Sequence, residues 1–495
     1  MDTLSTAHNR VLNSDLRQRI MSADDAAALI HNGDNIGMSG FTGSGYPKEF
    51  PPALARRMDK DREAGNPLRV GVFTGASTGP ELDGALAAAN GMQVRLPYQS
   101  DPAVRKRIND GDMEYGYLGK LNMAVIEVAA IYEDGRAIPS TSLGNNKSWL
   151  ECADRVILEV NSWQSIDLEG MHDVYYGLDV PPRREPIPIT RSGQRIGSPY
   201  LNIPLEKVVA VIETHSPDRN TAFKEPDKAS LQIAGHILEF LDWEVKKGRM
   251  PADLLPIQSG VGNIANAVLF GLNQGNFHNL TAYTEVIQDG MIELIKSGKM
   301  ISASATSFSL GPEMIKEVYG NLRDYRRSIV LRTQDISNNP GIIRRFGVIS
   351  MNGMMEADLY GNVNSTHIMG SKIMNGIGGS GDFARNAYLS IFMAPSTAAK
   401  GTISTIVPMV SHVDHTEHDT QVLVTERGLA DLRGLSPKQR ARLVIEKCAS
   451  EEFKPLLKDY FERAQKNGTG MHTPHILSEA HGFHERYLKT GKMLP

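Results

Sequence analysis

The sequence predicts an α/β protein made of two open domains, each a mainly parallel sheet with helices on both faces. Three observations favour this class. Short apolar runs alternate with amphipathic helical segments over most of the chain. Several runs end in a glycine-rich turn that leads into a helix, as LRVGVFTG (68–75) does. The length of 495 residues exceeds one ordinary domain and suits two of roughly 200–250 residues each.

In the first half, strands are expected at 34–40, 68–75, 122–131, 155–161 and 207–214. NMAVIEVAAI (122–131) is apolar almost throughout, which is typical of a strand buried on both faces. FPPALARRMDK (50–60) is expected to form a helix with proline in its first turn.

The domain boundary is expected in a polar, proline-marked stretch. Residues 179–199 are rich in Pro, Arg and Gly and predict a long surface excursion. Residues 214–228 are polar and contain two prolines. We therefore expect an N-terminal domain at 1–222 and a C-terminal domain at 223–495.

The second half repeats the plan of the first. A helix is expected at 229–250, and LPIQSG (255–260) leads through a glycine turn to a second helix, NIANAVLFGLNQG (263–275). Strands are expected at 280–285, 301–308, 328–333, 347–352, 403–408 and 421–426. Both halves show an early strand, a glycine turn and a helix, and then a strand with polar residues at its end. This suggests two similar domains, and a site that draws residues from both.

Composition narrows the class of protein. The net charge of −4, with acids and bases interspersed, gives no electrostatic case for nucleic acid or an anionic membrane as the main partner. Cys152 and Cys448 are far apart in the sequence and lie in apolar segments with helical spacing, so neither a disulfide framework nor a cysteine metal site is supported. No signal peptide and no run of ~20 apolar residues is visible. We expect a cytoplasmic protein, although an organelle matrix fits the same features.

Four glycine-rich loops could approach a ligand through their main-chain N–H groups: FTGSG (41–45), TGASTG (74–79), SGVGNI (259–264) and GIGGSGDF (376–383). None has the lysine and Ser/Thr of a Walker loop. One such loop is usually only a tight turn. Four in one α/β chain favour ligand binding.

Glu285 is the first candidate for chemistry. It ends the run LTAYTE, in which Leu280, Ala282 and Thr284 are expected on one face and Glu285 on the other. A carboxylate at the carboxyl end of a strand is well placed for work at the edge of an open sheet. A lone glutamate is more often a solvated edge residue, so its surroundings decide between the two interpretations.

Three further polar residues follow strands or turns, and each has a plain alternative. The Asn338 amide could donate to an oxyanion, or it could serve the turn before Pro340. Glu426 could position water or a substrate, or it could cap a helix starting near Leu429. Ser77, in the TGASTG turn, could instead be a helix cap.

The run SHVDHTEHD (411–419) has histidines at 412, 415 and 418, a spacing that suggests a metal site. On a helix His418 would lie roughly 120° from His412, and on a strand His415 would point away from the other two. We therefore expect a polar loop and no metal site here, and the same for HTPH (472–475).

Several long segments together resemble a known family: GFTGSGYPK, TGASTGP, QSGVGNIANAV, YTEVIQDG, SNNPGIIRR, GSKIMNGIGGSGDFARNAY and VTERGLADLRG. They are similar to class I coenzyme A transferases, and more narrowly to the acetyl-CoA hydrolase/transferase branch with its bacterial succinyl-CoA:acetate CoA-transferases. The resemblance covers about 33–494. It implies two tandem α/β domains, an active site at their interface and commonly a homodimer.

The resemblance also implies a role for individual residues. Glu285 matches the family's nucleophile, and Asn338 and the Gly379 N–H match its oxyanion donors. Glu426 and Ser77 match polar positions around the nucleophile. The remaining matches concern coenzyme A: Gly260, Val261, Gly262, Asn263 and Ile264 lie against it, Asn375 and Lys400 lie along it, and Arg219 meets it or a carboxylate. STAAKGT can be aligned in two registers, so the match of Lys400 depends on which one holds.

The implied chemistry is ping-pong transfer of coenzyme A through an acyl-glutamyl anhydride and a glutamyl-CoA thioester, with no metal and no tightly bound cofactor. Mammalian-type 3-oxoacid transferases carry Ser-Glu-Asn-Gly, whereas Val286-Ile287-Gln288 follows the glutamate here. That departure favours acetate and succinate as partners. The alternatives are an acetyl-CoA hydrolase on the same scaffold and a metabolite sensor, although no helix-turn-helix text or basic cluster supports a sensor.

Overall fold

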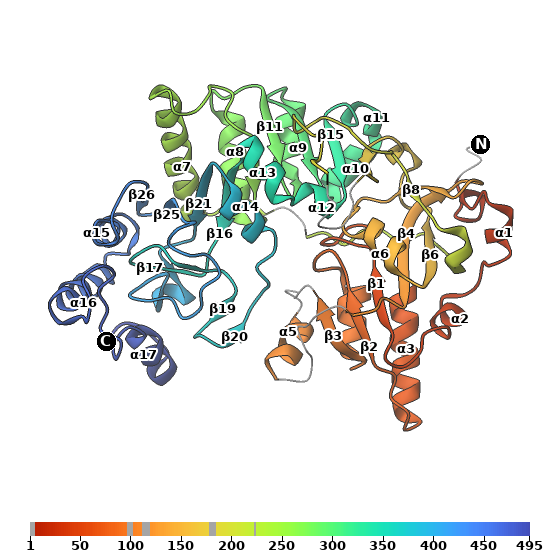
Figure 1. Ribbon diagram of the computed structural model, residues 1–495, viewed down its shortest axis with the longest axis horizontal. Helices are drawn as coiled ribbons and strands as arrows, with labels where there is room; N and C mark the ends of the chain where they lie inside the picture. The colour runs from red at the N-terminus through yellow and green to blue at the C-terminus, as the bar shows by residue number, and fades with distance from the viewer. Residues whose placement is uncertain (1–4, 97–101, 111–118, 178–184, 222–223) are drawn as a thin grey trace. The chain divides into compact units, whose positions relative to one another are not determined.

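The computed structural model describes residues 5–96, 102–110, 119–177, 185–221 and 224–495 (Figure 1). The chain forms two compact units that do not follow the sequence in order. Unit 1 consists of Met1–Phe223, Thr284–Asp289 and Ser302–Asn339, and unit 2 consists of Lys224–Tyr283, Gly290–Ile301 and Pro340–Pro495. The predicted α/β class with mainly parallel sheets is confirmed. The division into domains at residues 222 and 223 stays a prediction.

The larger sheet of unit 1 has six strands in parallel, in the spatial order β3-β2-β1-β4-β6-β9. β5 pairs antiparallel with β4, and β8 pairs antiparallel with β5. The strand bounds are β1 Asn35–Met38, β2 Val70–Phe73, β3 Met92–Leu96, β4 Met123–Ile131, β5 Arg136–Pro139, β6 Arg155–Asn161, β8 Leu201–Asn202 and β9 Val208–Thr214. The strands predicted at 34–40, 68–75, 122–131, 155–161 and 207–214 are all present.

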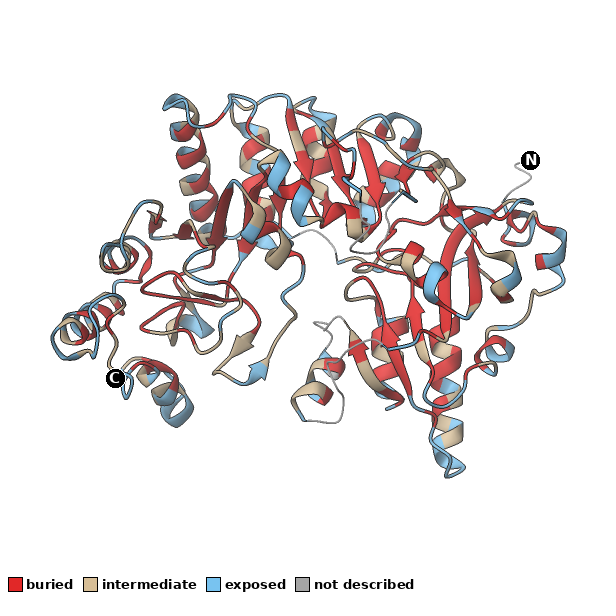
Figure 2. Ribbon diagram, in the orientation of Figure 1, coloured by how far each residue is buried: buried red, intermediate tan, exposed pale blue. Residues whose placement is uncertain are grey.

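Strand β4 shows why this half folds as it does. Met123 and Val125 pack into one hydrophobic cluster, whereas Ala124, Ile126 and Val128 pack into another. Because side chains alternate along a strand, these two clusters cover opposite faces of the sheet. All nine residues of β4 are buried, and Figure 2 shows β4 and β6 buried along their length. The prediction of a strand buried on both faces is confirmed.

The helices of unit 1 include α3 Phe50–Glu63, with prolines in its first turn as predicted. The others are α1 Ser14–Arg17, α2 Ala23–Ala27, α4 Ala85–Ala88, α5 Pro102–Asn109, α6 Asn146–Cys152, α10 Pro312–Gly320, α11 Leu322–Tyr325 and α12 Gln334–Ser337. Of the predicted excursion at 179–199, residues 179–184 lie outside the described residues. Ile187 and Ile189 are buried, so this stretch is not wholly on the surface as expected.

A second set of strands in unit 1 comes from distant parts of the chain. β7 (His172–Asp173) pairs in parallel with β15 (Ile329–Arg332), which pairs in parallel with β13 (Met300–Ala305). β12 (Val286–Gln288) pairs in parallel with β14 (Ser307–Ser309). The stretch 301–308, predicted as one strand, is therefore divided between β13 and β14.

Unit 2 contains four parallel strands in the order β25-β21-β16-β10, with β11 parallel beside β10 and β26 antiparallel beside β25. Their bounds are β10 Ile257–Ser259, β11 Leu280–Tyr283, β16 Ile349–Gly353, β21 Leu389–Met393, β25 Val422–Thr425 and β26 Gly428–Asp431. Short strands form small additional sheets: β17 Glu356–Asp358, β18 Val363–Asn364, β19 His367–Ile368, β20 Lys372–Ile373, β22 Thr397–Ala398, β23 Ile403–Ser404 and β24 Ile406–Val407.

Helices α7 (Lys228–Lys246) and α8 (Asn263–Gln274) match the two helices predicted around β10. The remaining helices of unit 2 are α9 Asp289–Lys296, α13 Pro340–Phe346, α14 Ser380–Asn386, α15 Pro437–Cys448, α16 Lys454–Asn467 and α17 Gly482–Thr490. One hydrophobic cluster joins α15, α16 and α17 to β17 and β24. In the described residues, no helix has the length and apolar character needed to cross a bilayer.

Candidate active site

Glu285 lies at a junction between two strands. β11 ends at Tyr283 and β12 begins at Val286, and the two strands belong to different sheets. The predicted alternation of faces from Leu280 to Ile287 is therefore wrong, because the chain leaves one sheet and enters another at Thr284 and Glu285. The backbone there is held on both sides. The Thr284 N–H donates to the Ser304 carbonyl oxygen (2.9 Å), and the Thr306 N–H donates to the Glu285 carbonyl oxygen (3.0 Å).

Asn338 holds the Glu285 side chain. Its Nδ2 donates to Glu285 Oε1 at 3.0 Å, within unit 1. The side-chain amide cannot rotate by half a turn without losing a hydrogen bond, because the Ser337 hydroxyl donates to Asn338 Oδ1 at 2.8 Å. Asn338 is buried, and its own N–H donates to the Gln334 carbonyl oxygen (2.9 Å), which makes it the C-cap of α12. The structure thus brings these two candidates together, and Asn338 serves the turn before Pro340 as well.

Two of the glycine loops lie side by side in unit 1. The Gly75 N–H donates to the Gly40 carbonyl oxygen (3.2 Å), and a Cβ at Gly79 would lie 2.0 Å from the Tyr46 hydroxyl. Ser77 lies half-buried in the second loop. It does not cap the helical segment that follows, because that segment begins at Pro80 with Gly79 as its N-cap. The helix-cap alternative for Ser77 is therefore wrong.

Arg219 lies against the first of these loops and against the helical segment that follows the second. Its N–H donates to the Gly43 carbonyl oxygen (2.8 Å), and its Nε donates to Glu81 Oε1 (2.8 Å). The Tyr46 hydroxyl donates to the other oxygen of Glu81 (2.6 Å). Burial raises the pKa of Glu81, but the hydrogen bonds from Tyr46 and Arg219 outweigh it and hold the pKa below its usual value. A negative Glu81 therefore anchors the guanidinium of Arg219, whose side chain is half-exposed.

A buried ionic cluster lies behind the first loop. Lys48 Nζ donates to Glu127 Oε2 (2.6 Å) and to Asp218 Oδ1 (2.9 Å), and these side chains are at most 4% exposed. Asp218 also accepts from the Gly45 N–H (3.0 Å) and from the Thr141 hydroxyl. Burial lowers the pKa of Lys48, but the two carboxylates more than compensate, so the lysine stays charged. The cluster fixes the loop at Gly45.

The loop also reaches the strand beside Glu285. The Ser44 hydroxyl donates to the Phe308 carbonyl oxygen (2.7 Å), and the Ser307 hydroxyl donates to the Phe41 carbonyl oxygen (3.1 Å). Both Ser307 and Phe308 belong to β14, the partner of β12. The ionic cluster, the loop and the strand after Glu285 therefore form one connected framework in unit 1.

In unit 2, Gly260, Val261, Gly262, Asn263 and Ile264 follow β10 and begin α8, as predicted. Gly262 has φ 123° and ψ −179°, a conformation that only glycine adopts readily. The Gly260 N–H donates to the Met351 carbonyl oxygen (3.0 Å). Val261 is 64% exposed, so the turn presents its backbone and this side chain to solvent.

Glu426 lies at the same edge of the sheet as this turn. It follows β25, and β10 and β25 run parallel within one sheet, so their carboxyl ends meet at one edge. Its carboxylate accepts from the Ser396 N–H (2.7 Å) and from the Ser396 hydroxyl. Leu429 lies in β26, which pairs antiparallel with β25, so the predicted helix near Leu429 is wrong and Glu426 caps no helix there.

The other candidates of unit 2 lie on loops. Asn375 Nδ2 donates to the Ser365 carbonyl oxygen at 2.7 Å. Gly379 is buried and is the N-cap of α14. Lys400 is exposed at the tip of the β22–β23 hairpin, where its φ of 56° is left-handed.

Two domains of one family match the chain. Residues 4–213 match the acetyl-CoA hydrolase/transferase N-terminal domain, and residues 315–461 match the acetyl-CoA hydrolase/transferase C-terminal domain. The chain is 50% identical to the succinyl-CoA:acetate CoA-transferase of Clostridium kluyveri, over 98% of this chain and 92% of that protein. The chain belongs to the acetyl-CoA hydrolase/transferase family. The resemblance in the sequence is confirmed, and the family consists of enzymes.

Other relatives within the acetyl-CoA hydrolase/transferase family carry different names. The chain is 42% identical to the propanoyl-CoA:succinate CoA transferase of Escherichia coli, over 96% of this chain and 98% of that protein. It is also 42% identical to an acetyl-CoA hydrolase of Neurospora crassa, over 98% of this chain and 97% of that protein.

Solved structures share the fold. RipA from Yersinia pestis superposes with a TM-score of 0.68 at 22% identity, covering 90% of this chain and 98% of that chain. The 4-hydroxybutyrate CoA-transferase of Porphyromonas gingivalis gives 0.63 at 22% identity, with the same coverage. At these identities the likeness establishes the fold.

Sequence reasoning missed the residues that hold the candidates in place. Ser396 follows β21, a strand that was not predicted, although the run LSIFM (389–393) before Pro395 could have revealed it. Glu81 gave no signal because it acts on Arg219, 138 positions later in the chain. Ser365 gave none because it holds Asn375 through its backbone carbonyl oxygen and not through its side chain.

The histidine run at 411–419 forms bends and turns, as predicted. Within the described ranges, no three His, Cys, Asp or Glu side chains form a group that could hold a metal ion. His415 is buried, His418 is exposed, and His412 Nε2 lies 3.4 Å from Asp414 Oδ1. In HTPH (472–475), His475 Nδ1 lies 2.9 Å from the Tyr460 hydroxyl.

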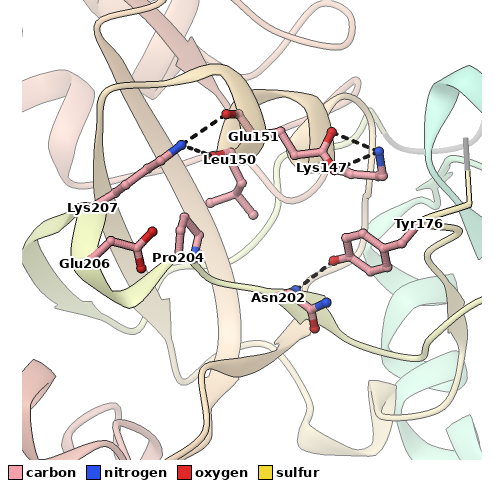
Figure 3. A pocket seen from close by; sticks show the side chains of 8 residues that line it. All are labelled: Lys147, Leu150, Glu151, Tyr176, Asn202, Pro204, Glu206 and Lys207. Carbon is pink, nitrogen blue, oxygen red and sulfur yellow. Dashed lines mark hydrogen bonds and ion pairs between the residues drawn. The ribbon is translucent and has the colours of Figure 1, made fainter. Parts of the chain in front are cut away.

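One well-defined pocket of unit 1 contains none of the candidates (Figure 3). Its volume is about 230 Å³. Lys207 Nζ donates to the carbonyl oxygens of Leu150 (3.3 Å) and Glu151 (3.0 Å) at the end of α6. Lys147 pairs with Glu151 (2.9 Å), so both lysines of this pocket are already partnered by the protein.

Proposed function

We propose that this protein transfers coenzyme A between small carboxylates, converting succinyl-CoA and acetate to acetyl-CoA and succinate. The substrate pair is taken from the name of the Clostridium kluyveri relative, at 50% identity. Glu285 is the proposed nucleophile. The observation that carries the proposal is the hydrogen bond of 3.0 Å from buried Asn338 to the Glu285 carboxylate, because it joins a nucleophile to an oxyanion donor.

The reaction proceeds in two halves. The Glu285 carboxylate attacks the thioester carbonyl of succinyl-CoA, the C–S bond breaks, and the thiolate of coenzyme A leaves an acyl-glutamyl anhydride. The thiolate then attacks the glutamyl carbonyl of the anhydride, succinate departs, and a glutamyl-CoA thioester remains. Acetate reverses these steps and departs as acetyl-CoA. Charge is conserved at each step, because one anion enters as another leaves.

The geometry around Glu285 supports a specific role for Asn338. When the thiolate attacks the glutamyl carbonyl, the negative charge develops on an oxygen of Glu285 itself. Asn338 Nδ2 already lies 3.0 Å from Oε1, within the range expected of an oxyanion donor. We assign Asn338 to the tetrahedral states centred on the glutamyl carbon, and the Gly379 N–H to those centred on the acyl carbon.

Roles for the remaining candidates complete the proposal. We assign the turn 260–264, Asn375 and Lys400 to coenzyme A, and Arg219 to the carboxylate or to coenzyme A. Glu426 and Ser77 provide polar groups around the nucleophile. No metal or tightly bound cofactor takes part. We further expect a cytoplasmic homodimer, which light scattering of the purified protein would test.

A hydrolase that uses water as the final acceptor is the second candidate, because relatives at 42% identity are named acetyl-CoA hydrolase. The two functions differ in their need for a carboxylate. For a transferase, loss of acyl-CoA depends on added acetate and saturates with it. Rapid loss of acyl-CoA in the absence of any carboxylate acceptor would favour the hydrolase.

The nucleophile is tested by trapping. The enzyme is mixed with an acyl-CoA and reduced with borohydride, and its peptides are analysed by mass spectrometry. We expect the peptide that contains Glu285 to carry the glutamyl side chain reduced to its alcohol. The Glu285→Gln variant, treated in the same way, provides the control. Reduction at any other carboxylate would contradict the assignment.

Glu285→Ala should lower the rate of transfer at least about a thousandfold. The protein should stay folded, because the backbone at position 285 keeps its hydrogen bond from Thr306. Glu285→Asp should lose roughly a hundredfold, since one methylene withdraws the nucleophile by over ~1 Å. Steady-state rates measure the transfer, and circular dichroism measures whether the variants are folded. Turnover of Glu285→Ala near that of the wild type would refute the mechanism.

A further inference from the structure

The segment SHVDH (411–415) holds the loop that carries two candidate residues. We propose that Asp414 and His415 are positioning residues for the loop 365–380, Asp414 for Asn375 and His415 for Gly379. The inference rests on the proposed function, because it assigns Asn375 to coenzyme A and Gly379 to an oxyanion. All of these residues belong to unit 2.

Asp414 organises the start of the loop. Its side chain is 8% exposed. Oδ2 accepts from the Ser365 N–H (2.7 Å), and the two carboxylate oxygens accept from the Thr366 hydroxyl (2.9 and 2.7 Å). A buried carboxylate that accepts several hydrogen bonds fixes its donors more firmly than a neutral acceptor does. The backbone at Ser365 and Thr366 is therefore held by Asp414.

The same two residues hold Asn375. The Ser365 carbonyl oxygen accepts from Asn375 Nδ2 (2.7 Å), and the Thr366 carbonyl oxygen accepts from the Met374 N–H (2.8 Å). Between these contacts, β19 and β20 form a hairpin that returns the chain to Asn375. Asp414 therefore acts on the Asn375 amide through one residue, Ser365, without touching it.

His415 organises the other end of the loop. Its Nε2 lies 3.2 Å from the Ser380 hydroxyl oxygen, and that hydroxyl donates its single proton to the Ile377 carbonyl oxygen (2.7 Å). Nε2 must then carry a proton and donate it to Ser380. Ser380 begins α14 directly after Gly379, so this hydrogen bond fixes the turn that orients the Gly379 N–H.

His415 is itself rigid. Its N–H donates to the Val363 carbonyl oxygen (3.0 Å), and its own carbonyl oxygen accepts from the Val363 N–H (2.8 Å). Its ring packs on Phe392 of β21, with 4.6 Å between ring centroids. Asp414 and His415 are neighbours in the sequence, and the backbone N–H of each donates to the Val363 carbonyl oxygen (2.9 and 3.0 Å). One segment can therefore hold both ends of the loop.

The first test replaces the carboxylate with its amide. Asp414→Asn should raise KM for acyl-CoA about tenfold and leave kcat and KM for acetate within about twofold, because a loosened Asn375 loses its orientation toward coenzyme A. The matched control is Asp358→Asn. Asp358 is also buried and accepts the N–H groups of Tyr360, Gly361 and Asn362, but these hydrogen bonds stay within its own turn and do not reach residues 365–380.

The second test separates the ring of His415 from its donor. His415→Phe keeps an aromatic ring against Phe392 but removes the donor to Ser380, and kcat should fall about tenfold with KM for acyl-CoA little changed. His415→Gln restores an N–H donor and should recover part of the loss. His418→Asn, at an exposed position of the same run, should have no effect.

Two readouts distinguish positioning from general destabilisation. If Asp414 acts through Asn375, adding Asp414→Asn to Asn375→Ala should raise KM no further. If the two substitutions raise KM independently, so that their effects multiply in the double variant, the inference is overturned. It is also overturned if the kinetic losses of Asp414→Asn only match those that Asp358→Asn shows for the same fall in unfolding temperature.

Hydrogen exchange separates this inference from the proposed function. The amides of 374–380 should exchange faster in Asp414→Asn and His415→Phe than in the wild type or Asp358→Asn. Should the wild type transfer no coenzyme A, faster exchange would still support the positioning role while the proposed function fails. Unchanged exchange, together with unchanged kinetics, would overturn the inference alone.

Discussion

Units 1 and 2 hold their candidate residues by different means. In unit 1, side chains hold side chains: Asn338 donates to Glu285, and Arg219 and Tyr46 donate to Glu81. In unit 2, the groups that contact the candidates directly are mostly main-chain N–H and carbonyl groups. The Ser396 N–H donates to Glu426, the Asn375 amide donates to a carbonyl oxygen, and Gly260 bonds to a neighbouring strand.

The difference predicts which substitutions should destabilise each unit most. A network of buried side chains fails when one member is removed, because its partner is left buried and unpaired. A backbone arrangement tolerates changes of side chain, but it fails when a residue can no longer adopt the required φ and ψ. Unit 1 should therefore be sensitive to changes of charge, and unit 2 to changes of conformation.

The largest effect is expected at Lys48. Lys48→Met leaves Glu127 and Asp218 buried without their cation, which should lower the free energy of unfolding by about 3–5 kcal/mol. Arg433→Met in unit 2 should cost less, because Glu244 keeps its contact with Arg249. Urea unfolding of both variants measures the two losses. Equal losses would break the comparison between the units.

Asn338→Ala should cost about 3–4 kcal/mol of transition-state stabilisation, seen as a fall in kcat of roughly a hundred- to a thousandfold. The physical reason is the loss of the donor 3.0 Å from Glu285 Oε1. The neighbouring change Asn339→Ala, which lies outside this contact, serves as the control. A fall in kcat below tenfold for Asn338→Ala would mean that another group stabilises the oxyanion.

Two buried carboxylates, one in each unit, should affect stability with opposite dependence on pH. In unit 2, burial raises the pKa of Glu244, but hydrogen bonds from Arg249 and Arg433 outweigh it and lower the pKa to about 2. Its ordinary value is 4.5, so its contribution is complete above about pH 4.5 and is lost as pH falls toward 2. The stability gap between wild type and Glu244→Gln should therefore shrink on acidification.

In unit 1, burial and the nearby charge of Glu127 raise the pKa of Glu159 to about 7. The folded state then binds the proton more tightly than the unfolded state, so stability falls as pH rises from about 4.5 to 7. The stability of the wild type should therefore fall relative to that of Glu159→Gln over that range. Unfolding midpoints measured from pH 3 to pH 8 test both variants, with exposed Glu239→Gln as the control. Gaps that change in the same direction would contradict the opposite signs.

The smallest effect is expected at Gly262. With φ at 123° and no atom within 4 Å of an added Cβ, Gly262→Ala should cost about 1–3 kcal/mol of stability through conformation alone. Gly260→Ala, two residues earlier in a conformation open to other residues, should cost less than about 1 kcal/mol. Urea midpoints of the two variants provide the measurement, and similar losses would show that the turn is not strained.

The strands of the sheets could be predicted from the sequence because their signal is local. The apolar run at 122–131 and the alternation of runs with helices depend on neighbouring residues alone. Glu285 was identified from a strand end and a family resemblance. Its face was not, because the change from β11 to β12 depends on pairing with β14, more than 20 residues later.

Other features depend on distant partners and left no local signal. The stretch after Glu426 suggested a helix near Leu429, but antiparallel pairing with β25 makes it a strand. Lys48 reads as a surface lysine, and only partners 79 and 170 positions away explain its burial. The same holds for Ser396, whose importance depends on a carboxylate 30 residues later.

The order in which the chain builds unit 1 affects its synthesis. Residues 1–223 lack β12, β14 and β15, which arrive only with 284–289 and 302–339. About a hundred further residues must be synthesised before His172 can pair with Leu331 or Ser44 can bond to Phe308. A gene truncated after residue 223 should accordingly yield an aggregation-prone fragment rather than an autonomous half-protein.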